Sequence, residues 1–167
     1  ARENEPCRPR SVYGRTKAEA EEALRQLPIP VTVVRFGKIL EPGNALLKGW
    51  VTGLCRGEKV RPFRDLKLAP VPLRFAVEVL AYVAEHTTHG LVQVTADRDV
   101  NYEEVARHIA GKVGAPSALV QTAHSSEAGF PQGCVPLHTT LDTSRLRREL
   151  VLTPPDVWAT IDEVLGL

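Results

Sequence analysis

Apolar and polar residues follow one another in stretches that predict helices separated by short strands. Residues 12–27 combine good helix formers with charged side chains and stop before Pro28, which predicts a helix. The next apolar run, residues 31–36, is rich in β-branched side chains and ends at Gly37, which favours a buried strand. A helix, a short loop and a buried strand in this order are typical of an α/β fold.

The rest of the chain continues this alternation around two irregular stretches. Local start and stop signals mark one helix clearly, because Asn101 with Glu104 predicts a capping box and Gly114 a helix end. A last helix is expected to reach Leu165, with a proline of the run 153–156 in its first turn. Apolar spacing predicts further helices at residues 45–55 and 72–85 and a strand at 90–95, whereas residues 41–70 and 115–140 are otherwise predicted to be mostly loop.

Composition and charge narrow the class of protein. The 167 residues include 21 Lys and Arg against 20 Asp and Glu, a formal net charge of +1, which argues against a dedicated nucleic-acid or anionic-membrane binder. The contents of 43% hydrophobic and 25% charged residues are those of a soluble globular domain. The longest apolar runs are far shorter than the ~20 residues that span a bilayer, so no membrane partner is expected.

Cysteine and methionine usage adds two expectations. Cys7, Cys55 and Cys134 are odd in number and widely spaced, which suits neither a disulfide framework nor a metal site. We therefore expect reduced thiols in a cytoplasmic protein, with Cys55 and Cys134 buried and inert. Methionine is absent, so Ala1 is not a translational start and the chain is expected to be processed, truncated or incompletely represented.

The sharpest local motif is Tyr13-Gly-Arg-Thr-Lys17. Residues four apart share one face of a helix, so a phenol would lie beside an ammonium group. A nearby ammonium stabilises a phenolate, which allows the hydroxyl to exchange a proton with a carbonyl or an alcohol, as hydride-transfer chemistry requires. The alternative is a solvated Lys17 next to a Tyr13 at the helix boundary, and the spacing alone does not decide between them.

Five segments in one order extend this motif into a resemblance. The segments are Glu5-Pro6 and Pro9 with Tyr13 to Lys17 and Glu21, then Val33-Val-Arg-Phe-Gly37, then Gly43-Asn44 with Lys48, then residues 65–72, and finally His138-Thr-Thr-Leu-Asp-Thr-Ser-Arg-Leu146. Together they resemble the extended short-chain dehydrogenase/reductases of the NAD-dependent epimerase/dehydratase superfamily, particularly the dTDP-4-dehydrorhamnose reductase-like branch.

The resemblance implies the carboxy-terminal part of a Rossmann-like parallel sheet with a small α/β substrate-binding region. Residues 1–40 would hold the catalytic helix and the following strand. Residues 41–167 would be mostly substrate-binding, with residues 65–95 returning to the Rossmann core. The family's glycine-rich dinucleotide fingerprint and the Ser or Thr partner of its tyrosine are missing from the chain, so we expect it to be the carboxy-terminal half of a larger reductase-like protein.

The resemblance also implies roles for single residues. Tyr13 would donate a proton to the substrate carbonyl, and Lys17 would bind the nicotinamide ribose of NAD or NADP. The same resemblance implies cofactor contacts by Arg35, Phe36 and Gly37, and contacts of Asn44 and Lys48 with the sugar or diphosphate of a nucleotide sugar.

Other polar residues have both a functional and a structural interpretation. The basic run 56–64, with Arg61, could hold a nucleotide diphosphate or form a solvated surface. His86 and His89 lack a local third metal ligand and fit surface residues at a helix end, so no metal site is predicted. His124 and His138 fall in predicted loops from which they could approach a substrate.

The leading hypothesis is therefore an NAD(P)-dependent oxidoreductase that reduces a 4-keto nucleotide sugar, with a homodimer as a further expectation. Two alternatives stay open: a non-catalytic nucleotide-sugar-binding or regulatory subunit on the same fold, and a nucleotide-sugar epimerase or dehydratase that uses the same Tyr and Lys. The sequence leaves the sugar and the choice between NAD and NADP undetermined.

Overall fold

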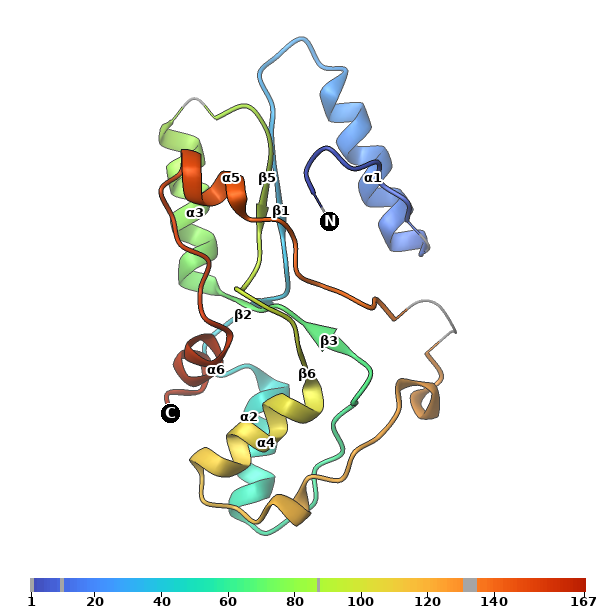
Figure 1. Ribbon diagram of the computed structural model, residues 1–167, viewed down its shortest axis with the longest axis vertical. Helices are drawn as coiled ribbons and strands as arrows, with labels where there is room; N and C mark the ends of the chain where they lie inside the picture. The colour runs from blue at the N-terminus through green and yellow to red at the C-terminus, as the bar shows by residue number, and fades with distance from the viewer. Residues whose placement is uncertain (1, 10, 87, 131–134) are drawn as a thin grey trace.

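A pair of parallel five-residue strands separates two groups of helices in the computed structural model, which describes residues 2–9, 11–86, 88–130 and 135–167. Strand β1 (Thr32–Phe36) pairs with β5 (Gly90–Val94), and Phe36 lies opposite Val94 at their carboxyl ends. Helix α1 (Val12–Arg25) lies on one side of this pair, and α3 (Leu73–Glu85) and α5 (Ser144–Glu149) lie on the other (Figure 1). The α/β class with parallel strands is confirmed.

The second part of the molecule lies beyond the carboxyl ends of β1 and β5 (Figure 1). Its elements are the helices α2 (Ala45–Cys55), α4 (Tyr102–Lys112) and α6 (Val157–Leu165), the parallel pair β2 (Ile39–Leu40) with β4 (Val71–Pro72), the antiparallel pair β3 (Lys67–Leu68) with β6 (Val100–Asn101), and the 3₁₀ turns η1 (Ser117–Leu119) and η2 (Ser125–Ala128).

Two apolar clusters hold these parts together. The first joins the β1–β5 pair to α3 and α5 through Val79, Val92, Val94 and Leu146, all fully buried. The second is built around α2, α4 and α6 and includes the buried Ile109. Each large apolar side chain removed from water contributes about 1.5–3 kcal/mol. Helix α1 belongs to neither cluster and has no buried residue, so the described residues pack less densely on its face of the sheet.

Local sequence signals account for most element ends. The capping box is confirmed, because the Glu104 amide donates to Asn101 Oδ1 at 2.8 Å and the Asn101 amide donates to Glu104 Oε2 at 2.6 Å. The last helix differs from the prediction: Asp156 is its N-cap, with its side chain accepting from the Ala159 amide, and both prolines precede the cap instead of occupying the first turn.

The prediction of a buried Cys55 is wrong, because this last residue of α2 is exposed. Cys7 is exposed as well, and Cys134 lies outside the described residues. In the described ranges, no helix has both the length and the apolar character that crossing a membrane requires.

Candidate active site

The amino-terminal end of α1 presents the predicted tyrosine and lysine on one face. Ser11 begins the helix, since its hydroxyl accepts a hydrogen bond from the Gly14 amide at 3.0 Å. Tyr13 and Lys17 follow one turn apart, and the Lys17 ammonium lies 5.6 Å from the centroid of the Tyr13 ring. The geometric prediction is therefore confirmed, because the phenol and the ammonium are neighbours.

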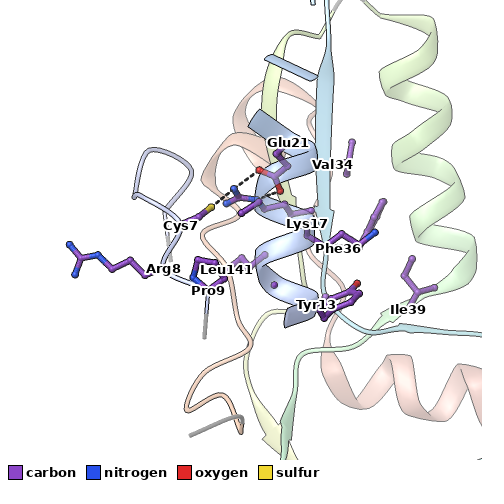
Figure 2. A pocket seen from close by; sticks show the side chains of 14 residues that line it. Cys7, Arg8, Pro9, Tyr13, Lys17, Glu21, Val34, Phe36, Ile39 and Leu141 are labelled. Atoms are coloured by element: carbon purple, nitrogen blue, oxygen red, sulfur yellow. Dashed lines mark hydrogen bonds and ion pairs between the residues drawn. The ribbon is translucent and has the colours of Figure 1, made fainter. Parts of the chain in front are cut away.

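A cavity of about 730 Å³ separates this face of α1 from the carboxyl end of β1 (Figure 2). Tyr13 and Lys17 line it from the helix, Phe36 from the end of β1, Ile39 from β2, and Pro9 from the loop before the helix. Tyr13 is 74% exposed, so its hydroxyl is open to a ligand. The carboxyl ends of parallel strands are where α/β folds bind ligands, and the volume lies within the ~300–1,000 Å³ usual for small-molecule sites.

The strand contributes the three residues expected to contact a cofactor, and all three line the cavity. Gly37 allows the backbone of Ala69 to pass close to the end of β1, because a Cβ atom at Gly37 would lie 2.6 Å from the Ala69 carbonyl oxygen. Phe36 is half-buried beside it. The Arg35 guanidinium has protein partners: it donates to both carboxylate oxygens of Glu21 and to the Cys7 sulfur.

Glu21 belongs to the first of the five resemblance segments, but its sequence position gave it no role of its own. Its carboxylate is 15% exposed and paired with Arg35 at 2.6 Å. The hydrogen bond from Arg35 lowers the pKa of Glu21 below its usual value, and the same contact raises that of Arg35. The missed signal was its position four residues after Lys17, on the face that already carried the two candidate catalytic residues.

The predicted substrate residues lie in the second part of the molecule and do not line this cavity. Asn44 caps α2, where its side chain accepts from the Leu47 amide at 3.4 Å and donates to Glu41 at 2.9 Å. Lys48 is exposed one turn later. Arg61 is also exposed and donates to Glu127 at 2.9 Å.

A cavity residue that sequence reasoning missed comes from residues 138–141, called here the return segment. Leu141 lines the cavity next to the α1 face. Asp99 holds the segment: its Oδ1 accepts from the Thr139 amide at 2.9 Å, the Thr139 hydroxyl at 2.6 Å and the Thr140 amide at 2.8 Å. Burial by itself would raise the pKa of Asp99, but these hydrogen bonds outweigh it and lower the pKa to about 2.

The histidines considered as substrate contacts each lie beside a carboxylate. His138 Nδ1 is 3.3 Å from Asp99 Oδ2, and His124 Nδ1 is 3.1 Å from Asp65 Oδ2. Asp65 also accepts from the Ser125 hydroxyl and amide, which fixes the turn η2 against the segment that carries Arg61. Within the described ranges, no group of three or more His, Cys, Asp or Glu side chains could hold a metal ion.

Comparison with protein families gives one match that covers nearly the whole chain. The sequence profile of the family described as the RmlD substrate binding domain matches residues 2–166. Among the curated proteins, no sequence matches the chain.

Several solved structures with similar folds are enzymes named for nucleotide sugars or hold bound nucleotides. They include the Bordetella bronchiseptica enzyme WbmG in complex with NAD and UDP (20% identity, TM-score 0.79, covering 98% of this chain and 51% of that one). Another is the dTDP-4-dehydrorhamnose reductase of Bacillus anthracis in complex with NADP (17%, 0.81, 96% and 57%). A third is the UDP-N-acetylglucosamine 4-epimerase of Bacillus cereus (16%, 0.73, 98% and 57%).

These similarities establish a shared fold. The chain spans only about half the length of the three proteins, which is 51–57% of each. Their α/β architecture agrees with the parallel β1–β5 pair and the helices on both of its sides.

Proposed function

The chain belongs to the RmlD substrate-binding-domain family, and from this premise we propose that its protein is an oxidoreductase that reduces a 4-keto nucleotide sugar with NADH or NADPH. One observation carries the proposal: Tyr13 and Lys17 lie side by side on the cavity at the carboxyl end of β1. A tyrosine that only packed against a neighbour would not need a hydroxyl open to a cavity and a lysine one turn away.

The side chains around the cavity fit a nicotinamide nucleotide. Lys17 offers an exposed ammonium as donor to ribose hydroxyls, and Phe36 offers a half-buried aromatic side chain at the end of β1. When bound, this cofactor supplies the hydride that attacks the carbonyl carbon. Phe36 and Gly37 would then lie against the nicotinamide at the end of β1.

Tyr13 and Lys17 divide the proton chemistry between them. As the carbonyl carbon accepts the hydride, its oxygen gains negative charge and takes the proton of the Tyr13 hydroxyl, so the O–H bond of Tyr13 breaks and an alcohol forms. The phenolate left on Tyr13 is stabilised by the Lys17 ammonium nearby. Proton transfer by a positioned side chain typically contributes about 10²–10⁴-fold to the rate.

Nucleotide-sugar recognition is proposed for the second part of the molecule. Lys48 on α2 and Arg61 offer cations for a diphosphate, and Asn44 lies one turn before Lys48. Arg61 would exchange its exposed partner Glu127 for a phosphate oxygen, at small cost because an exposed ion pair contributes only about 0–1 kcal/mol.

A second candidate is epimerase or dehydratase chemistry. It is favoured by the fold similarity to the Bacillus cereus 4-epimerase, which has a TM-score comparable to that of the reductase. Such an enzyme would use the same Tyr13 and Lys17 and would return the hydride to the sugar, so that reduced cofactor is not consumed.

The test is a Tyr13→Phe variant assayed with NADPH or NADH and dTDP-4-dehydrorhamnose. We expect the variant to lose turnover and to keep its affinity for the cofactor, since only the proton donor is removed. Tyr82→Phe is the matched control, because the Tyr82 hydroxyl donates to the Glu149 carbonyl oxygen on the other side of the sheet.

Each alternative gives a distinct result. Unchanged turnover in Tyr13→Phe contradicts the catalytic assignment. Conversion of a sugar nucleotide without net oxidation of the reduced cofactor supports an epimerase or dehydratase. Binding of dTDP or UDP without turnover of sugar supports the non-catalytic subunit.

A further inference from the structure

Within the described residues, apolar packing contributes little to the position of helix α1. None of its residues is buried, and cavities remain between it and the sheet. One is the active-site cavity of about 730 Å³, and another, of about 520 Å³, lies towards the carboxyl end of α1 beside Glu22 and Arg25. Because voids forfeit the dispersion contacts that hold packed helices in place, polar contacts between α1 and β1 become important for the distance between them among the described residues.

The Glu21–Arg35 ion pair supplies that connection. Arg35 Nε donates to Glu21 Oε1 at 2.8 Å, and Nη2 donates to Oε2 at 2.6 Å, with the two side chains only 15% and 21% exposed. A two-point contact between a planar guanidinium and a carboxylate fixes orientation as well as distance. Arg35 Nη2 also donates to the Cys7 sulfur at 2.9 Å. One guanidinium on β1 therefore contacts both helix α1 and the loop before that helix.

No other side chain of α1 makes such a link in the part of the chain that the structure describes. The remaining side-chain hydrogen bonds of α1 stay within the helix, its cap Ser11 and Gln26. Glu22 is the closest comparison: its carboxylate is 60% exposed and binds Arg25 and Gln26 only. Of these two adjacent glutamates, only Glu21 is shielded from solvent and reaches the sheet.

The position of Glu21 on the helix connects this ion pair to the site. Tyr13, Lys17 and Glu21 are spaced four residues apart and all line the same cavity (Figure 2). A helix held at Glu21 is fixed in rotation and in translation along its axis, and Lys17 and Tyr13 are then placed one and two turns away.

We propose that Glu21, held by Arg35, is a positioning residue that sets where Tyr13 and Lys17 lie relative to the end of β1. This inference rests on the proposed function for its catalytic consequence, whereas the attachment of α1 to the sheet stands on the contacts alone. Arg35 thus acts on the reaction through Glu21 as well as through any contact with the cofactor.

The first test needs no ligand and compares Glu21→Ala with Glu22→Ala in the full-length protein. Both replace a glutamate of α1 by the same good helix former, so the change in helix propensity cancels. Amide hydrogen exchange should become faster along α1 in Glu21→Ala and stay at the wild-type rate in Glu22→Ala. Glu21→Gln, which keeps the side-chain volume, serves if Glu21→Ala does not fold. Equal exchange in the two alanine variants overturns the proposal.

The second test separates positioning from general stability. With NADPH and dTDP-4-dehydrorhamnose, at a temperature where all variants are folded, Glu21→Ala should lower kcat about 100-fold with little change in KM, as expected when a catalytic group is misplaced by about 1 Å. Wild-type kcat in a variant whose α1 exchanges faster also overturns the proposal. If the wild type turns over neither this sugar nor any other 4-keto nucleotide sugar, the proposed function fails, and the exchange comparison still decides whether Glu21 holds α1.

Discussion

Replacing Asp99 with asparagine measures what the return segment contributes to stability. Burial alone would raise the pKa of Asp99, but hydrogen bonds from Thr139, Thr140 and His138 lower it from 3.8 to about 2. Because the folded pKa is below the unfolded value, the carboxylate stabilises the fold above pH 3.8, and this contribution is lost as the pH falls through about 2.

The size of the effect follows from the same pKa values. The difference between 3.8 and about 2, at about 1.4 kcal/mol per pH unit, corresponds to about 2 kcal/mol at neutral pH. The Asp99 side chain is only 15% exposed, so solvent screening removes little of this. For a chain of this length, such a loss lowers Tm by roughly 6 °C.

The assay is urea unfolding followed by the fluorescence of Trp50 and Trp158, repeated from pH 7 to pH 2. Asp99→Asn should be less stable by about 2 kcal/mol at pH 7, and the deficit should shrink below pH 4. Thr139→Val removes one of the hydrogen bonds and should cost about 1 kcal/mol. Glu19→Gln, at an exposed acid of α1, controls for the loss of a charge. A wild-type midpoint in Asp99→Asn at pH 7, or a deficit that is equal at pH 7 and pH 2, refutes this reasoning.

Two further substitutions should raise stability. Val151 has a φ of 57° and is 81% exposed, so Val151→Asn should relieve about 1 kcal/mol of left-handed backbone strain, seen as a higher Tm by circular dichroism; a lower Tm contradicts this. Gln93 is fully buried on β5, and its amide has no hydrogen-bond partner among the described residues. Gln93→Leu should therefore add about 1 kcal/mol to the free energy of unfolding in urea, whereas a loss would show that the amide is hydrogen-bonded in solution.

The sequence by itself determined the features that depend on neighbouring residues. Three such features were predicted: the capping box at Asn101, the span of α2, and the neighbouring turns that carry Tyr13 and Lys17. They could be predicted because hydrogen bonds and side-chain faces within a helix repeat over three or four positions. The α/β class followed from the order of helices and strands, and the parallel sheet from the family resemblance, whereas the pairing of β1 with β5 was not predicted.

Only the tertiary structure decided the contacts between segments far apart in sequence. Glu21 reads as one more solvated glutamate of a helix until Arg35 is brought against it, and Asp99 meets Thr140 across 41 positions. Leu141 lines the cavity because the hydrogen bonds from Thr139 and Thr140 to Asp99 place the return segment at the end of the sheet. Such pairs depend on how the whole chain packs, and a local pattern carries no record of which partner the fold will supply.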